Sequence, residues 1–316
     1  MKSARVGVIG VGHLGFHHAR NYASITEADL VGVVDADVAR CREVARQFCP
    51  EGACASIAEL IGRGIDAASV VVPTTHHFEV AMQLIEAGVD VLVEKPLAAT
   101  IDEAQAMVDA AREHARILQV GHIERFNGAV AALFGAVRQP RFIEVHRLSP
   151  YPMRGDDVSV VLDLMIHDLE IIRALVGSPI ASVDAVGVPV FSATEDIANA
   201  RLRFENGCVA NITASRVSMD KMRKIRIFEP DAYMSTDYGE QEVRVYRKRP
   251  GAVDTGASPM EHILIDSLPV ERGEPLRREL TDFLRCVRER ARPLVDGEDA
   301  TEALRLAQEI INSIRR

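Results

Sequence analysis

Residues 5–15 read RVGVIGVGHLG, an apolar run from Val6 to Ile9 that ends in the glycine pattern Gly10-Val11-Gly12-His13-Leu14-Gly15. The next residues, FHHARNYAS, are compatible with the start of a helix. Strand, glycine turn and helix in this order predict a unit that binds a dinucleotide, with its phosphates at the helix N-terminus. We expect Gly10 to permit the tight turn, Gly12 to admit the pyrophosphate and Gly15 to let the helix pack on the strand. His13 and Leu14 then belong to the same cofactor-binding loop.

A second apolar run, Leu30 to Val34, ends in Asp35, twenty residues beyond Gly15. A carboxylate at this position accepts hydrogen bonds from the adenosine ribose hydroxyls and repels a 2′-phosphate. The predicted cofactor is therefore NAD rather than NADP. A structural glycine turn that binds nothing is the alternative interpretation.

The composition fits a folded protein of two globular domains, with 316 residues, 47% of them hydrophobic and 26% charged. The formal net charge of −9 argues against a general nucleic-acid or anionic-membrane surface, because such binding needs a basic face. An anionic substrate must then be met by local arginines. No signal-peptide pattern opens the sequence and no apolar run reaches membrane length, so we expect a cytoplasmic protein.

The cysteines number five, an odd count without paired CxxC spacing, so the sequence predicts neither a disulfide framework nor a zinc site. We expect reduced thiols and no bound metal. The cysteines are Cys41, Cys49, Cys54, Cys208 and Cys286.

The first 120 residues alternate apolar strand patterns with helical segments. This alternation predicts a doubly wound parallel sheet of the α/β class, with helices on both faces. We place an NAD-binding domain at residues 1–120. The expected strands run over Val6 to Ile9, Leu30 to Val34, Ala68 to Val72, Val89 to Val93 and Ile117 to Val120.

From Arg141 onward alternating stretches dominate, among them IANARLRF and CVANITASR, and the Asn206-Gly207 dipeptide between these two is a hairpin signal. We expect a large, open, mostly antiparallel sheet in a second, α+β domain at residues 121–316. The expected helices run over Val158 to Val176, Leu276 to Arg290 and Ala300 to Ser313, and a mobile loop is expected over Gly251 to Ser258.

The tripeptide Glu94-Lys95-Pro96 follows the apolar run Val91-Leu-Val. Ligands of open α/β sheets collect at the carboxyl ends of the strands, so we expect Lys95 to point toward the nicotinamide. There its ammonium can hydrogen-bond a substrate hydroxyl and stabilise developing alkoxide charge. A solvated lysine at a strand end is the alternative.

Asp163 and His167 are four residues apart on an expected helix and therefore share one face. Histidine is suited to take a proton from an alcohol near neutral pH. The alternative is a hydrogen-bonded Asp/His pair without a catalytic role. A zinc site is not indicated, because two potential ligands without a nearby third do not define one.

In this order the three clusters resemble the glucose-fructose oxidoreductase / inositol dehydrogenase / MocA family of sugar dehydrogenases. The matching motifs are GVGHLG, PTTHH with Pro73 and His77 in a Pro-x-x-x-His pattern, EKP at 94 to 96, and Asp163-xxx-His167. The resemblance covers essentially the whole chain. It implies a Rossmann domain and an α/β domain whose open sheet commonly forms a dimer or tetramer interface.

The same resemblance implies residue roles. Lys95 and His167 would flank the reacting carbinol beside the nicotinamide, either of them able to act as the base, and Asp163 would support or orient them. Cofactor contacts are implied for Pro73, Thr74, His77, Glu94, Lys95 and Arg125.

The segment Gly121-His-Ile-Glu-Arg-Phe-Asn127 is similar to the GH-x-ERFNPA stretch of nucleotide-sugar members, with Gly128 in place of the usual proline. This likeness implies oxidation of the C3 hydroxyl of a nucleotide sugar, UDP-N-acetylglucosamine before others. The product would feed an aminotransferase in diamino-sugar synthesis for lipid A or a related polysaccharide. The expected substrate-binding residues are Lys95, Arg125, Asn127, Arg154, Asp163, His167 and Arg216, with Arg147 a further diphosphate candidate.

Several alternatives stay open on the sequence. Arg125 can instead form an interdomain salt bridge. A dehydrogenase of a free sugar, polyol or inositol on the same fold would gain no affinity from a uridine diphosphate group. An NAD-responsive binding protein would keep the glycine loop but lack a converging lysine and histidine. Glycoside cleavage assisted by redox chemistry also occurs on this fold, and nothing in the sequence favours it.

Overall fold

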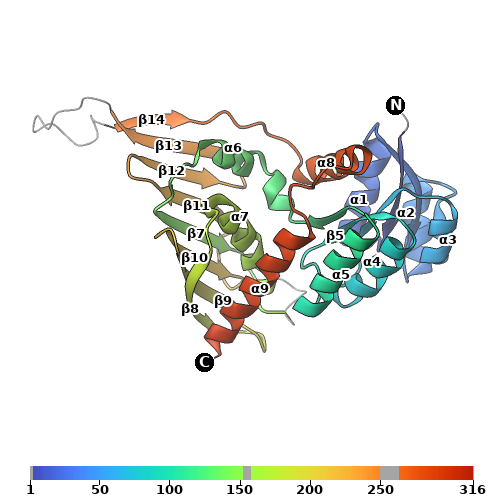
Figure 1. Ribbon diagram of the computed structural model, residues 1–316, viewed down its shortest axis with the longest axis horizontal. Coiled ribbons are helices and arrows are strands. Elements are labelled where there is room, and N and C mark those ends of the chain that lie inside the picture. Colours follow the sequence, from blue (N-terminus) through green and yellow to red (C-terminus); the bar gives the residue numbers. More distant parts are fainter. Residues whose placement is uncertain (1–2, 152–157, 250–262, 316) are drawn as a thin grey trace, which may run out of the picture. The chain divides into compact units, whose positions relative to one another are not determined.

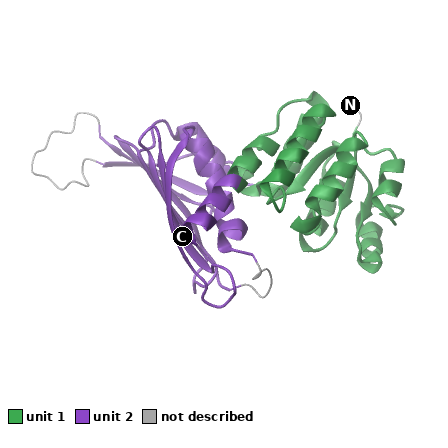
Figure 2. Cartoon of the chain, turned by 60° about the horizontal axis from the view of Figure 1, so that its bottom comes forward, with its two compact units in different colours: residues 1–126, 274–304 green, residues 127–273, 305–316 purple. Residues whose placement is uncertain are grey.

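The computed structural model describes residues 3–151, 158–249 and 263–315. The chain forms two compact units (Figure 2): Met1–Phe126 with Glu274–Leu304, and Asn127–Gly273 with Arg305–Arg316. A single division after residue 120 therefore does not describe the chain. The first unit extends to Phe126, and the segment 274–304 returns to it after the second unit has been built.

The first unit contains a six-stranded parallel sheet in the order β3-β2-β1-β4-β5-β6. This is the strand order of the dinucleotide-binding fold, in which the order reverses between β1 and β4. The predicted α/β class and the five predicted strands are confirmed, and the two-residue β3 is additional. The strands are β1 Ala4–Ile9, β2 Ala28–Val34, β3 Ala53–Cys54, β4 Ala67–Val70, β5 Asp90–Glu94 and β6 Leu118–Gly121.

Local capping signals fix several helices of this unit. The Asp37 carboxylate accepts the N–H groups of Ala39 and Arg40 at the start of α2, and Thr100 forms a capping box with Glu103 at the start of α5. The helices are α1 His13–Ser24, α2 Val38–Phe48, α3 Ile57–Gly62, η1 Thr74–His76, α4 His77–Glu86, α5 Ile101–Glu113, η2 Ile123–Phe126 and α8 Pro275–Glu289.

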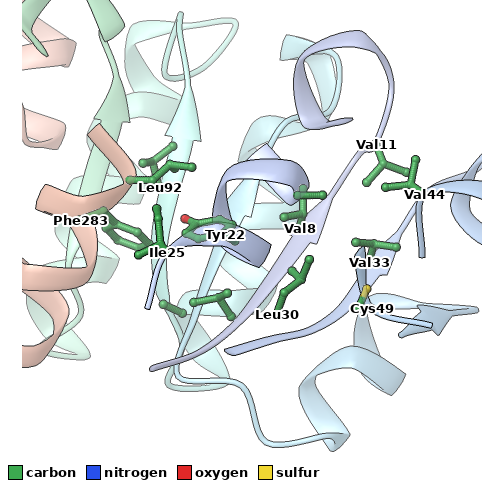
Figure 3. Close-up of a cluster of buried hydrophobic side chains, with 14 of the residues drawn as sticks. Val8, Val11, Tyr22, Ile25, Leu30, Val33, Val44, Cys49, Leu92 and Phe283 are labelled. Atoms are coloured by element: carbon green, nitrogen blue, oxygen red, sulfur yellow. The ribbon is translucent and has the colours of Figure 1, made fainter. Parts of the chain in front are cut away.

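Helix α8 belongs to the first unit because its apolar face completes that unit's core. Phe283 is fully buried in the same cluster as Tyr22, Ile25 and Leu92 (Figure 3). Burying a side chain of this size contributes roughly 1.5–3 kcal/mol. The other buried apolar residues that α8 adds to the cluster are Leu276, Leu280, Leu284 and Val287.

The second unit is built on an eight-stranded sheet in the order β14-β13-β12-β11-β7-β10-β9-β8 (Figure 1). Only the neighbours β7 and β10 run parallel, so the predicted mostly antiparallel sheet is confirmed. The strands are β7 Phe142–Leu148, β8 Ile180–Val188, β9 Ile197–Phe204, β10 Val209–Ser215, β11 Met222–Phe228, β12 Ala232–Asp237, β13 Glu242–Lys248 and β14 Ile263–Ser267.

The hairpin predicted at Asn206-Gly207 is present between β9 and β10. Gly207 adopts φ +85°, the left-handed region that glycine enters without strain. The strands pair in register, with Val209 opposite Arg203 and Ser215 opposite Ile197.

The helices of the second unit differ from the prediction in two respects: helix α6 (Gly128–Ala136) was not predicted, and the long predicted helix is not α-helical from its start. The helix expected over Val158 to Val176 starts with a π-helical turn, η3 Val161–Met165, before continuing as α7 Ile166–Val176. Such widened turns are rare and are frequently found at functional sites. The remaining helices are α6 Gly128–Ala136 and α9 Gly297–Ile314, whose residues are divided between the two units after Leu304.

All five cysteines are buried free thiols. Burial raises the pKa of Cys49 and of Cys286 to about 11, so both remain protonated at neutral pH. In the described part of the chain, no helix combines the length and the apolar character needed to cross a bilayer. The loop expected at Gly251 to Ser258 lies outside the described residues.

Candidate active site

The glycine loop at the carboxyl end of β1 has the geometry that a dinucleotide requires. Gly10 adopts φ +84°, and an added Cβ there would lie 2.5 Å from the Val71 carbonyl oxygen. A Cβ on Gly15 would lie 1.8 Å from the Gly10 carbonyl oxygen, so only glycine lets α1 approach the turn. A Cβ on Gly12 would meet nothing within 4 Å. The loop therefore closes tightly at its two ends and is open at its middle.

The N-terminus of α1 has the features of an anion site. Gly12 is the N-cap and supplies no side-chain acceptor, and no acidic residue stands in the first turn. Gly12, His13 and Leu14 are exposed at this point. The first N–H groups of a helix lack partners within the helix and carry its positive dipole end, so this turn fits a pyrophosphate.

Asp35 follows β2 and holds the glycine loop. One oxygen of its carboxylate accepts the Val11 N–H at 2.6 Å, and the other accepts the Asp37 N–H at 2.8 Å. Each carboxylate oxygen can accept a further hydrogen bond. The half-buried carboxylate can thus serve both the loop and a ribose hydroxyl.

Replacing Asp35 with alanine is expected to raise the dissociation constant for NADH by at least about tenfold, since hydrogen bonds to charged groups contribute about 1.5–3 kcal/mol. Nucleotide fluorescence titration measures this change. The matched control is Asp37→Ala, which removes the carboxylate that caps α2 and should lower stability by about 1 kcal/mol with little change in NADH affinity. Equal losses of NADH affinity in both variants would contradict the assignment of Asp35.

The end of β4 leads into a segment tied to the EKP tripeptide by His77. Its Nδ1 lies 2.9 Å from the Pro96 carbonyl oxygen, and its Nε2 lies 2.9 Å from the Val72 carbonyl oxygen. Burial lowers the pKa of His77, although both carbonyl groups act in the opposite direction. His77 therefore joins two strand ends from within, whereas Pro73 is exposed and Thr74 half-buried at the same edge.

At the end of β5, the Glu94 side chain lies in the interior of the unit and Lys95 lies at the edge of the sheet. The Glu94 carboxylate is buried, and its Oε1 lies 3.0 Å from Nε2 of His18 on α1. Glu94 was expected to contact the cofactor, but this side chain is engaged in the interior of the unit. Lys95, half-buried, is the first residue after the strand.

His122 and Arg125 follow β6 at the same sheet edge. His122 is 2% exposed, and its burial, together with the positive charges of Lys95 and Arg125, lowers its pKa to about 3. Lys95, His122 and Arg125 are thus close enough to interact electrostatically. The sequence interpretation gave His122 no role, although its place directly after a strand of the parallel sheet was available as a signal.

The neutral state of His122 predicts a pH dependence of stability. Its pKa is about 3 in the folded protein and 6.5 unperturbed, so the unfolded chain binds a proton first as the pH falls. Stability should therefore fall below pH 6.5, with a contribution approaching about 1.4 kcal/mol per pH unit from this residue. When the free energy of unfolding is measured with denaturant between pH 5 and 6.5, it should change less steeply with pH in His122→Gln than in wild type. His114→Gln, at an exposed histidine, should keep the wild-type slope.

In the second unit, Asp163 lies in the π-helical turn and His167 in the first turn of α7, and both are half-buried. The neighbouring Asp168 is fully buried, and its carboxylate forms a bidentate ion pair with Arg147 at 2.6 and 3.0 Å. Arg147 therefore anchors α7 to β7 within the unit. Asp163 and His167 lie four residues apart, on the two sides of the junction between the π turn and α7.

Two expected substrate residues of this unit have structural roles. Arg216 is fully buried, and its Nε donates to the Asp196 carboxylate at 2.8 Å, so its guanidinium is not offered to a diphosphate. Asn127 caps α6 through Oδ1, and its Nδ2 donates to the Tyr238 carbonyl oxygen. Arg154 lies outside the described residues.

The parallel sheet in this order, the uncapped glycine turn and the carboxylate after β2 define a dinucleotide-binding protein of the Rossmann class. Residues 4–122 match the model of the oxidoreductase family with an NAD-binding Rossmann fold, and residues 125–231 match the GFO/IDH/MocA C-terminal domain. The chain belongs to the Gfo/Idh/MocA family of oxidoreductases. It is an enzyme, an NAD-dependent dehydrogenase of a family that acts on sugars and polyols.

Several relatives match this chain over nearly its whole length. The UDP-N-acetylglucosamine 3-dehydrogenase of Acidithiobacillus ferrooxidans is 36% identical over 97% of this chain and 96% of that protein. Its crystal form P21 superposes with a TM-score of 0.92 over 99% of this chain and 98% of that chain. The scyllo-inositol 2-dehydrogenase (NAD(+)) of Bacillus subtilis is 29% identical over 98% of this chain and 94% of that protein.

Proposed function

We propose that this enzyme oxidises the C3 hydroxyl of a nucleotide sugar, UDP-N-acetylglucosamine, with NAD as the oxidant. The observation that carries the proposal is the 36% identity to a UDP-N-acetylglucosamine 3-dehydrogenase, which extends over 97% of this chain and 96% of that protein. The reaction matches the site residues, since the chain carries a lysine and a histidine suited to an alcohol and its alkoxide.

The residues of the first unit fit NAD. The open middle of the glycine loop and the uncapped start of α1 would hold the pyrophosphate, and Asp35 would bind the adenosine ribose and disfavour a 2′-phosphate. Pro73, Thr74, Lys95 and Arg125 line the same edge of the sheet. Bound NAD supplies the acceptor for the hydride that leaves the carbinol carbon.

The proton of the carbinol requires a base, and its oxygen requires a positive group. We assign the base to His167, whose imidazole takes the hydroxyl proton, and the stabilisation of the oxygen to the Lys95 ammonium. Asp163 orients or supports these two groups, in line with its place on the π turn before His167. If Lys95 is the base instead, the pH dependence of kcat that arises from proton transfer should persist in His167→Ala.

The product of this reaction is a 3-keto nucleotide sugar, which a downstream aminotransferase would convert to the 3-amino sugar of lipid A or a related polysaccharide. We also propose that the enzyme is a homodimer or homotetramer. A row of partly exposed aromatic rings crosses one face of the eight-stranded sheet, with Phe228 stacked on Tyr233 and Tyr233 on Tyr246 at 4.7 and 4.9 Å between centroids. Such a face is suited to a partner surface.

The test is the absorbance of reduced nicotinamide after mixing the protein with NAD and UDP-N-acetylglucosamine, UDP-glucose, free N-acetylglucosamine or myo-inositol. A carbonyl trap or an aminotransferase is included, because alcohol oxidation by NAD is usually unfavourable. A signal confined to UDP-N-acetylglucosamine supports the proposal. Silence with every sugar, in protein that binds NADH, would refute it.

A dehydrogenase of a free sugar, polyol or inositol is the second candidate. The observation that favours it is the 29% identity to a scyllo-inositol 2-dehydrogenase over 98% of this chain. A signal with myo-inositol or free N-acetylglucosamine in the same assay would support this function. It would also show that the substrate does not need a nucleotide group.

A further inference from the structure

A group of buried polar side chains lies inside the first unit, behind the end of β5. His18 and Tyr22 come from α1, Glu94 from β5, Gln119 from β6 and Glu279 from α8. All are buried, and Glu94, the most accessible, is 8% exposed. Glu94 is bonded through the chain to Lys95, so this interior group adjoins the sheet edge of the candidate active site.

The group contains two carboxyl groups and one imidazole. The Glu94 carboxylate has His18 Nε2 at 3.0 Å, and it fills the space over Gly121, where an added Cβ would lie 2.7 Å from its Oε2. Glu94 is therefore fixed in place by a partner on one side and by the backbone of β6 on the other.

Glu279 is completely buried. Within the described residues, neither of its carboxyl oxygens has a hydrogen-bond partner, unlike Glu94, and no cluster of His, Cys, Asp or Glu side chains could hold a metal ion. Its backbone carbonyl accepts a hydrogen bond from Gln119 Nε2 at 3.2 Å, which places Glu279 over β6. An ionised carboxylate in such a position is strongly unfavourable.

The groups that face Glu279 oppose its ionisation. Burial, followed by the negative charges of Glu94 and Asp282, raises the pKa of Glu279 well above its usual value. Asp282, on the same helix, is paired with Arg285 at 2.6 Å. From α1, the Tyr22 hydroxyl is hydrogen-bonded to Ser69 and its pKa is raised by burial, so it supplies no charge.

We infer that Glu94 and Glu279 form a buried carboxyl pair with a single negative charge, in which Glu279 keeps its proton at neutral pH and acts as a positioning residue for the strand end that carries Lys95. A second charge would repel the Glu94 carboxylate from its place between His18 and Gly121. The consequence for Lys95 rests on the proposed function, whereas the protonation of Glu279 does not.

The protonation state can be measured directly by infrared spectroscopy of the full chain. The difference spectrum between wild type and Glu279→Gln at pH 7 should contain the C=O stretch of a protonated carboxylic acid in the wild type. A difference spectrum that contains only carboxylate bands would overturn the inference. This measurement needs folded protein but neither cofactor nor substrate.

The second measurement is the pH dependence of unfolding. A folded-state pKa raised above the unfolded value of about 4.3 means that the native protein holds the extra proton, so stability falls as the pH rises through that interval. The wild-type unfolding constant, divided by that of Glu279→Gln, should rise about tenfold per pH unit until Glu279 ionises. Comparing the two proteins cancels the opposite contribution of His122.

The matched control is Glu289→Gln, which makes the same chemical change at an exposed position on α8. The wild-type unfolding constant divided by that of Glu289→Gln should not rise with pH. A ratio for Glu279→Gln that is also independent of pH would mean that Glu279 is ionised in the fold and would refute the carboxyl pair.

The positioning role is read from the pH profile of kcat, measured with the sugar that the panel identifies. In wild type kcat should fall at alkaline pH when Glu279 ionises, and in Glu279→Gln this fall should move to higher pH or vanish. Unchanged profiles, together with a protonated Glu279, would leave the proton in place but refute the link to Lys95. Failure to oxidise any sugar would refute the proposed function and with it the link to Lys95, but not the protonation of Glu279.

Discussion

Replacing Lys95 with methionine is expected to lower kcat for sugar oxidation by about 10²- to 10³-fold, because one donor aimed at a developing oxyanion contributes roughly 2.7–4 kcal/mol. His167→Ala should lower kcat by about 10²- to 10⁴-fold through loss of the general base. Neither side chain binds the adenosine half of the cofactor in our assignment. NADH affinity should therefore stay within about threefold of wild type, a change of less than 1 kcal/mol.

Steady-state kinetics with the substrate found in the sugar panel, combined with NADH fluorescence titration, measures both quantities. Lys221→Met, at an exposed lysine of the second unit, is the matched control and should keep wild-type turnover. If turnover and NADH affinity fell together with the content of folded protein, the two residues would be structural and the assigned roles wrong. A pH profile of kcat that loses its acidic limb in His167→Ala, but not in Lys95→Met, would identify the base.

Asp196→Ala is expected to destabilise the second unit by about 3–5 kcal/mol, because it leaves the Arg216 guanidinium buried without its counter-charge. One Asp196 oxygen accepts the N–H groups of Val190, Phe191 and Ser192 at 2.6–2.9 Å, and the other receives Nε of Arg216 at 2.8 Å. Burial opposes ionisation, but these donors outweigh it and hold the pKa of Asp196 well below its usual range.

Chemical denaturation followed by circular dichroism measures the loss in free energy of unfolding. Tryptophan fluorescence cannot be used, because the chain contains no tryptophan. Asp184→Asn, at an exposed aspartate of β8, is the control and should change stability by no more than about 0.5 kcal/mol. The double variant Asp196→Ala, Arg216→Met should lose less than the sum of the single variants, because it leaves no unpaired buried charge. Additive losses would show that the ion pair is not the source of the effect.

The parts of the site that depend on short stretches of sequence were predictable. The glycine turn, the strand before it and Asp35 lie within 35 residues and specify the turn through backbone sterics that only glycine satisfies at positions 10 and 15. The parallel order of the first sheet follows equally from the alternation of strands and helices.

The roles that depend on distant partners could not be read from the sequence. Arg216 pairs with Asp196 on the neighbouring segment, and the local pattern around either residue does not identify the other. Glu279 stands on an amphipathic helix whose charged residues would be assigned to solvent, yet the helix buries it against β6. The π turn before His167 likewise depends on tertiary packing, since the apolar spacing of the sequence fits an unbroken α-helix.

The return of the chain to its first unit has a consequence for the order of folding during synthesis. Phe283, Leu280 and Leu276 complete the core that β1, β2 and α1 begin, so that core remains open on one side until α8 has left the ribosome. The strands of the second unit, residues 142–267, emerge earlier and can pair first. The nascent first unit therefore exposes apolar surface while the second unit is being made and is open to aggregation until α8 is available to cover it.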